Sequence, residues 1–243
     1  MTQLLVVNPN TTASMTEIIA AAACQAAGPS TDIRAVTSEM GPVSIEGFYD
    51  EAFAVPGLLA QIAAGERAGA RAAIIACFDD TGLDAARAMA SIPVLGICES
   101  ALSLAAIVAK RFTVVTTMER SRVPIEELVD RYGMARKAHV RAANISVLSL
   151  EDPNSGARDK LRSEITRAIV EDNAEAIVLG CAGMADLART LQSEFGMPVI
   201  DGVGAAVKQA EALVALGLST SKRGAYAAPV AKSYTGMMAD FAP

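Results

Sequence analysis

The sequence predicts an α/β protein of two similar lobes, each built on a parallel sheet flanked by helices, and three observations support this fold class. Residues 71–97 and 174–203 share one order of features: an apolar strand, a cysteine, a glycine-containing turn, a helix, a proline and a second apolar strand. Strand and helix patterns alternate along the whole chain, which is typical of parallel sheets. The 243 residues are 52% hydrophobic but only 4% aromatic, which indicates an interior of small aliphatic side chains.

The first half of the chain contains four strand patterns with helix patterns between them. We expect strands at residues 4–8, 33–38, 72–78 and 94–97, where the sequence is apolar or alternating. Helices are expected in the Ala-rich stretch after Thr12, from about 51 to 65 or 68, and from 83 to 90. This order gives one complete lobe.

The second half repeats the pattern. We expect strands at residues 111–117, 144–150 and 176–181 and after Pro198, with helices at 123–132, at 157–172 and after Cys181. A further Ala-rich helix begins near Ala205. We therefore assign residues 1–98 to the first lobe and 99–204 to the second, with residues 205–243 packing back on the first.

Cys77 and Cys181 each stand at the carboxyl end of a buried strand and before a helix. Ligands of open parallel sheets bind at this end, where helix N–H groups lower the pKa of a thiol. Two such thiols on opposite lobes predict a two-base proton transfer: one thiolate removes a proton from a carbon beside a carbonyl, and the other thiol returns one to the opposite face. This chemistry needs no metal or redox cofactor if amides and hydroxyls stabilise the enolate-like charge.

Other roles for the cysteines are less well supported by the sequence. A nucleophilic cysteine needs a neighbouring base, and His139, which lies between charged residues, is expected on the surface. A disulfide is disfavoured in a reducing compartment, and a zinc site needs more ligands than these segments supply. We expect Cys24 and Cys98 to be apolar packing residues.

Polar residues in other loops are candidates for the same cleft. Asn10, Ser44, Thr116 and Thr117 follow expected strands and could bind an imide or carboxylate, although such residues are also ordinary turn and cap residues. A carboxylate beside a thiolate raises the pKa of the thiol. We therefore assign Asp79 to positioning or capping rather than to proton transfer.

Composition excludes several classes of partner. The net charge of −6 with dispersed basic residues argues against nucleic-acid binding. The sequence has neither an uninterrupted apolar run of about 18 residues nor a basic, cleavable N-terminal signal, so we expect a cytoplasmic protein without membrane contact. No glycine-rich phosphate loop follows the first strand.

Six motifs, which cover nearly the whole chain, give a resemblance to a known family. They are VVNPNT, SIEGFYDEAFA, ACFDDTGLDAAR, VLGICESA, FTVVTT and VLGCAGM. In these segments the chain resembles the Asp/Glu/hydantoin racemase superfamily and, within it, the hydantoin racemases, with allantoin racemases as close relatives. The resemblance implies pseudo-twofold symmetry, an active site between the lobes and a homo-oligomer.

The resemblance also implies roles for individual residues. Cys77 and Cys181 would be the paired acid and base, each serving one enantiomer, with no cofactor. The residues implied to hold a cyclic imide or ureide are Asn10, Ser44, Phe78, Asp79, Thr116, Thr117, Gly180, Ala182 and Gly183.

The expected substrate is a 5-substituted hydantoin, whose C5 hydrogen lies next to a carbonyl. Few Arg or Lys residues lie in the cleft motifs, which argues against an acidic amino acid, and the apolar residues Ile45, Phe48 and Phe78 favour an apolar substituent over the ureido group of allantoin. Allantoin stays an alternative. A related decarboxylase would lack one of the two cysteines, and a two-lobed binding receptor would carry an export signal.

Overall fold

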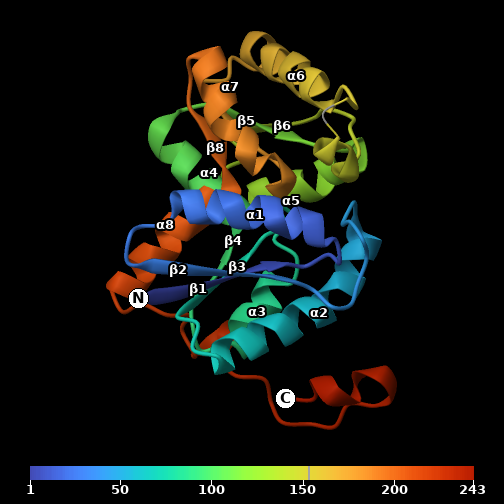
Figure 1. Cartoon of the computed structure of the whole chain (residues 1–243), viewed down its shortest axis with the longest axis vertical. Coiled ribbons are helices and arrows are strands. Elements are labelled where there is room, and N and C mark those ends of the chain that lie inside the picture. Colours follow the sequence, from blue (N-terminus) through green and yellow to red (C-terminus); the bar gives the residue numbers. More distant parts are fainter. Residues whose placement is uncertain (153) are drawn as a thin grey trace.

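Two parallel sheets of four strands form the framework of the protein, and this confirms the predicted fold class (Figure 1). The computed structural model describes residues 1–152 and 154–243. The first sheet has the order β2-β1-β3-β4, with β1 at Thr2–Asn8, β2 at Thr31–Thr37, β3 at Ala72–Ile75 and β4 at Val94–Gly96. The second has the equivalent order β6-β5-β7-β8, with β5 at Phe112–Thr116, β6 at Ala138–Ala142, β7 at Ala176–Leu179 and β8 at Val199–Asp201.

Helices connect the strands and cover both faces of each sheet. Those of the first half are α1 (Ala13–Ala26), α2 (Phe48–Arg67), α3 (Leu83–Met89) and α4 (Ile97–Val108). The second half has α5 (Arg122–Arg131), α6 (Ala157–Glu171), α7 (Ala188–Phe195) and α8 (Gly202–Ala215). Short 3₁₀ helices are η1 (Glu119–Ser121), η2 (Val147–Glu151), η3 (Ala182–Leu187), η4 (Gly224–Tyr226) and η5 (Gly236–Phe241).

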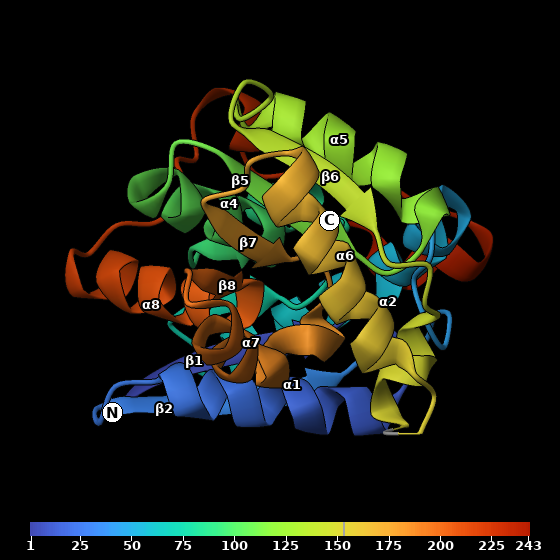
Figure 2. The same cartoon turned by 90° about the horizontal axis from the view of Figure 1, so that it is seen from above.

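The two lobes share one hydrophobic core. A single cluster of buried side chains includes Val6 and Ile74 of the first sheet, Phe112 and Val178 of the second, and Leu102 of α4 between them. Helices α1, α4 and α8 lie between the sheets (Figures 1 and 2). Separate clusters under α2 and α3, and under α6 and α7, fill the outer faces of the two sheets. This shared core holds the carboxyl ends of the two sheets against each other.

The C-terminal part of the chain contacts the first lobe. Helix α8 packs against α1, β3 and β4, and also against α4. Farther on, the Tyr226 hydroxyl donates a hydrogen bond of 2.8 Å to Asp84 in α3. The assignment of residues 1–98 with 205–243, and of 99–204, to two domains stays a prediction.

The structure contradicts two expectations about local structure. The second strand of the second lobe is β6, Ala138–Ala142, and not residues 144–150, because Asn144 has a positive φ of 53° that ends the extended run. The following residues form the loop that contains η2. Cys98 is fully buried as expected, but Cys24 is exposed on α1 and is not a packing residue.

The position of His139 agrees with the sequence. It lies in β6, opposite Thr113, and is exposed to solvent. Among the helices of the described residues, none combines the length and the apolar character needed to cross a membrane.

Candidate active site

Two topological switch points, one in each sheet, face a single pocket. Strand order reverses between β1 and β3 in the first sheet and between β5 and β7 in the second, and ligands of such sheets bind at the carboxyl ends of these strands. Asn10 follows β1, and Cys77 follows β3. At the equivalent places in the second sheet are Thr117 after β5 and Cys181 after β7. The duplicated motifs of the sequence therefore meet in space.

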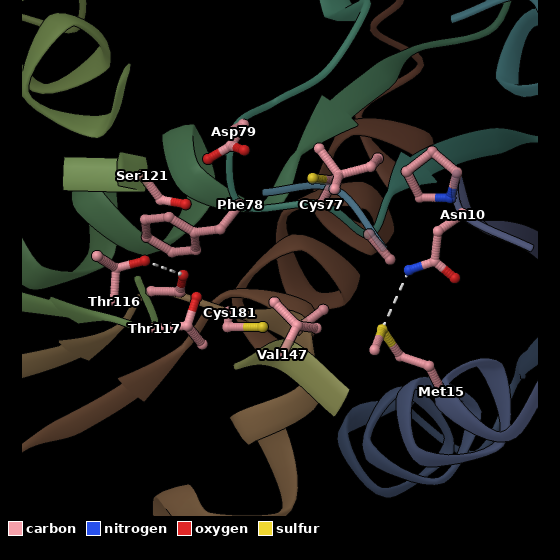
Figure 3. Close-up of a pocket in the computed structure, with 15 residues that line it drawn as sticks. Asn10, Met15, Cys77, Phe78, Asp79, Thr116, Thr117, Ser121, Val147 and Cys181 are labelled. Carbon is pink, nitrogen blue, oxygen red and sulfur yellow. Dashed lines mark hydrogen bonds between the residues drawn. The ribbon is translucent and has the colours of Figure 1, made fainter. Parts of the chain in front are cut away.

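The pocket is a cavity of about 40 Å³, with one thiol on each side. Figure 3 shows the Cys77 sulfur entering from the side of Asp79 and the Cys181 sulfur from the opposite side. The lining residues that the sequence had singled out for the site are Asn10, Cys77, Phe78, Asp79, Thr116, Thr117, Gly180, Cys181 and Ala182.

Ser44 and Gly183 do not line the pocket, although both are near it. The neighbour of Ser44, Ile45, lines the pocket instead, and the backbone N–H of Gly183 lies against the Cys181 thiol. Met15, Ser121 and Val147 also line the pocket and were not predicted. They come from α1, η1 and η2, which approach the strand ends only through tertiary packing, so no local motif marks them.

The turn after Cys77 is held by Asp80. The Asp80 N–H donates 3.1 Å to the carbonyl of Cys77, and Asp80 adopts a positive φ of 46°. Its buried carboxylate accepts hydrogen bonds of 2.9 Å from the N–H groups of Cys98 and Glu99 in the first turn of α4. It also accepts 2.7 Å from the hydroxyl of Tyr132, at the end of α5 in the second half of the chain. The acid after β3 that caps a helix is thus Asp80, and the helix that it caps is α4.

Gly96 permits this arrangement of Asp80. A Cβ at position 96 would lie 2.2 Å from Oδ1 of Asp80, a distance that no side chain could tolerate. A glycine at the end of β4 is therefore required for the turn that carries Cys77.

The position of Cys181 depends on close packing between β5 and β7. The Gly180 N–H donates a hydrogen bond of 2.9 Å to the carbonyl of Val115. The Thr116 hydroxyl donates a hydrogen bond of 3.1 Å to the carbonyl of Gly180. A Cβ on Gly180 would lie 3.0 Å from Cα of Thr116, so the glycine allows the two strand ends to approach. Cys181 then stands at the N-cap of η3, where its carbonyl accepts 3.1 Å from the N–H of Met184.

Asn10 presents an amide donor to the pocket. Its Oδ1 accepts two hydrogen bonds of 2.9 Å, one from the side-chain amide of Asn8 and one from the N–H of Thr12. These two bonds fix the orientation of the amide. Among the described residues, the Nδ2 group donates a hydrogen bond only to the weak acceptor Sδ of Met15, at 3.2 Å (Figure 3). A stronger acceptor in the pocket, such as a carbonyl oxygen, would replace this contact.

Both thiols have raised pKa values, which contradicts the lowering expected from helix ends. Burial raises the pKa of Cys77 well above its ordinary range, and burial raises the pKa of Cys181 to about 11. Helix α3 begins only at Leu83, and η3 is a 3₁₀ helix, so neither thiol lies on the first turn of an α-helix. The N–H groups of Asp79 and Gly183 oppose the effect of burial but do not cancel it.

Asp79 is the acidic group of the pocket. Burial and the nearby carboxyl groups of Glu51 and Asp80 raise the pKa of Asp79 to about 7. As a carboxylate, it in turn raises the pKa of both Cys77 and Cys181. The protonation of Asp79 therefore bears directly on whether a thiolate can form.

The chain is similar over its full length to characterised racemases. The model of the Asp/Glu/Hydantoin racemase family matches residues 4–210. A hydantoin racemase of Pseudomonas sp. (strain NS671) is 48% identical, covering 98% of this chain and 96% of its own. A second, from Rhizobium meliloti, is 49% identical, covering 95% and 96%. The solved allantoin racemase from Klebsiella pneumoniae has a TM-score of 0.97 at 46% identity, with all of both chains covered.

Fold and site together define a two-lobed α/β enzyme with a thiol from each lobe in one pocket. The chain belongs to the Asp/Glu/hydantoin racemase family, as the sequence motifs predicted, and it is an isomerase.

Proposed function

We propose that the enzyme interconverts the enantiomers of 5-substituted hydantoins by two-base proton transfer between Cys77 and Cys181. The observation that carries this proposal is the presence of both thiols on opposite sides of one pocket, each after the third strand of its sheet. A planar enolate held between them would present one face to each sulfur. Protonation from the side opposite to deprotonation inverts the carbon.

The proposed reaction begins with one cysteine as thiolate and the other as thiol. The thiolate takes the C5 proton, the C5–H electron pair moves toward the C4 carbonyl oxygen, and the opposite thiol then donates its proton to C5. The Asn10 amide and the hydroxyls of Thr117 and Ser121 line the pocket as side-chain hydrogen-bond donors, while the Thr116 hydroxyl already donates to the carbonyl of Gly180. We infer that they bind the ring and stabilise the developing negative oxygen.

The size of the pocket limits what it can enclose. A cavity of about 40 Å³ has room for about three water molecules at roughly 10–15 Å³ each. We therefore infer that the walls move apart when a substituted ring enters. Ile45 and Val147, which come from equivalent loops of the two lobes, are the side chains that would part, and the Glu46 carboxylate accepts 3.4 Å from the Val147 N–H across this junction.

Allantoin is the second candidate substrate, because the solved structure with TM-score 0.97 is an allantoin racemase. The apolar wall of Met15, Ile45, Phe78 and Val147 favours an apolar substituent over a ureido group. Initial rates with 5-alkyl hydantoins, 5-aryl hydantoins and allantoin, compared as kcat/KM, decide between the two substrates.

The mechanism is tested by following optical rotation and deuterium incorporation at C5 of an enantiopure hydantoin in heavy water. We expect Cys77→Ala and Cys181→Ala each to lower racemisation by about a thousandfold or more, because neither base can act for both faces. Each variant retains deuterium exchange with one enantiomer, and the two variants prefer opposite enantiomers. Cys24→Ala, which changes an exposed thiol on α1, is the matched control and keeps full activity. Substantial racemisation by both variants would exclude the two-base assignment.

Two further expectations accompany this function. The mechanism requires Cys77 and Cys181 to stay reduced, so we infer a cytoplasmic enzyme. The resemblance to the family also implies a homo-oligomer, which light scattering on the purified protein would test.

A further inference from the structure

A two-base racemase must restore its protonation state after every turnover. When one thiolate has taken the C5 proton and the opposite thiol has given its own, the charge lies on the other cysteine. Before the same enantiomer can react again, one proton must return from the first sulfur to the second. Both sulfurs line one pocket of about 40 Å³, and a titratable group in the same lining is placed to carry this proton.

Asp79 is the only ionisable group besides the two thiols among the described residues that line this pocket. It also lines a second, larger pocket of about 440 Å³ that continues outward between the lobes. Glu51 of α2 and Arg131 of α5 lie in the walls of this outer pocket, so polar groups from both halves of the chain surround its entrance. Asp79 thus stands at the junction between the enclosed thiols and the outer pocket.

We propose that Asp79 carries the proton that resets Cys77 and Cys181 between turnovers, an inference that rests on the proposed two-base function. In the reset, the thiol that received the C5 proton passes it to the Asp79 carboxylate and becomes a thiolate. The neutral Asp79 carboxyl then passes a proton to the opposite thiolate, directly or by exchange with solvent in the outer pocket. One proton moves in total, the Asp79 carboxylate is regenerated, and the thiolate charge returns to its starting sulfur.

Charge favours Asp79 for this task. As a carboxylate it raises the pKa of both thiols, so its protonation removes the charge that opposes the formation of a thiolate. The pKa of about 7 allows Asp79 to accept and release a proton near neutral pH. The other charged groups that line the outer pocket are Glu51, Asp80, Asp84, Arg87, Glu99, Glu127 and Arg131. They do not line the pocket of the thiols.

Two of these neighbours have roles different from proton transfer. Asp80 is engaged by the N–H groups of Cys98 and Glu99 and by the Tyr132 hydroxyl. Arg87 forms an ion pair of 2.5 Å with Glu99. Within the described part of the chain, the Asp79 side chain has no hydrogen bond or ion pair of this kind, and it lines both pockets, as a carrier must.

The test separates the reset from the chemical step. A slow reset lowers kcat but leaves kcat/KM unchanged, because kcat/KM reports only the free enzyme form that binds substrate. For Asp79→Asn we expect kcat to fall by about tenfold or more and KM to fall at least as much, so that kcat/KM is not lowered, because loss of the carboxylate also favours the thiolate that binds substrate. We also expect inhibition by the product enantiomer to change from competitive to noncompetitive, since product then binds an accumulating form of the enzyme.

Two variants control this measurement. Asp79→Glu keeps a carboxyl group and restores most of kcat and the competitive pattern. Glu127→Gln, which changes an exposed carboxyl that lines only the outer pocket, leaves the product inhibition competitive. Circular dichroism and thermal unfolding verify that each variant is folded.

Two outcomes would overturn the proposal. One is an Asp79→Asn enzyme with the kcat and the competitive inhibition of the parent. The other is a fall in kcat/KM as large as that in kcat, which would place Asp79 in the chemical step. Failure of the two-base function itself would be recognised separately, by racemisation in the Cys77→Ala and Cys181→Ala variants.

Discussion

Cys77 and Cys181 have to lose a proton in order to act, and their surroundings resist that loss. Burial, together with the Asp79 carboxylate, holds both thiols in the neutral form near pH 7, with the pKa of Cys181 raised to about 11. Only the thiolate is strongly nucleophilic toward alkylating reagents. Cys24, in contrast, is exposed on α1.

This contrast predicts the order of alkylation. With iodoacetamide at pH 7.5, Cys24 is modified first, and activity declines only in a later phase as Cys77 and Cys181 react. The two phases should differ in rate by about tenfold or more, because burial limits both access and ionisation. Mass spectrometry of digests taken at intervals, alongside activity, checks the order. The Cys24→Ala variant should lose the early labelling but keep the slow phase of inactivation.

At the scale of residues, the sequence predicted the pocket residues that follow strands but not those that come from helices. Cys77, Cys181 and Asn10 lie directly after strands, and parallel topology collects such residues at one edge. Met15 and Val147 reach the pocket from α1 and η2, whose directions depend on how the whole lobe packs. Thiol pKa was mispredicted for a similar reason, since burial is a property of the closed pocket and not of the motif.

At the scale of elements, the turn between β3 and α3 is tied to both halves of the chain. Asp80 connects the Cys77 carbonyl, the first turn of α4 and the Tyr132 hydroxyl at the end of α5. Burial raises the pKa of Asp80 to about 6 even though the Tyr132 hydrogen bond opposes this rise. This turn therefore depends on contact between the lobes.

Tyr132→Phe tests that dependence. The substitution removes the hydroxyl donor to a buried carboxylate, so we expect the free energy of unfolding to fall by about 1–3 kcal/mol. We also expect kcat to fall by about threefold to tenfold, because the loop that positions Cys77 loses an anchor. Urea unfolding and steady-state kinetics provide the two measurements.

Tyr226→Phe is the matched control. It removes a hydroxyl that bonds to Asp84 at an exposed site, so its stability should stay within about 0.5 kcal/mol of the parent. If Tyr132→Phe and Tyr226→Phe lowered the free energy of unfolding equally, the hydrogen bond to Asp80 would contribute no more to stability than the exposed one to Asp84.

The misplaced strand shows where element prediction reached its limit. Residues 144–150 have the apolar character of a strand, but the sheet uses the less apolar segment of β6 beside β5. An edge strand needs only one covered face, and its register is chosen by pairing with β5 rather than by its own hydrophobicity. Central strands β1, β3, β5 and β7, buried on both faces, were all found from their apolar runs.

At the scale of the whole molecule, two lobes with one core enclose several carboxyl groups with raised pKa. Burial raises the pKa of Asp79 to about 7 and that of Asp80 to about 6, and it also raises the pKa of Glu51. In the unfolded chain these groups return to ordinary values near 4. Between about pH 4 and 7 the folded protein therefore holds protons that the unfolded chain has released. Stability contributed by these groups falls as pH rises through this window.

Other carboxyl groups have lowered pKa values, and the stability that they contribute falls as the pH decreases. Hydrogen bonds from Arg141 lower the pKa of Asp172, and those from Arg167 and Arg141 lower the pKa of Glu171. Their contribution is present above about pH 4 and is lost as pH falls toward their lowered pKa values. The two groups of carboxyls together place the maximum of stability near pH 5.

We therefore predict that the Tm rises from pH 3 to about pH 5 and declines again from pH 5 to pH 8, when measured by calorimetry at constant ionic strength. Asp79→Asn replaces the group with the highest of these pKa values by a neutral isostere, so it should flatten the decline between about pH 6 and pH 8. Asp130→Asn, at an exposed position on α5, should leave the shape of the curve unchanged. A Tm that climbs steadily to pH 8 in the parent would show that the enclosed carboxyls are not the groups that govern stability near neutral pH.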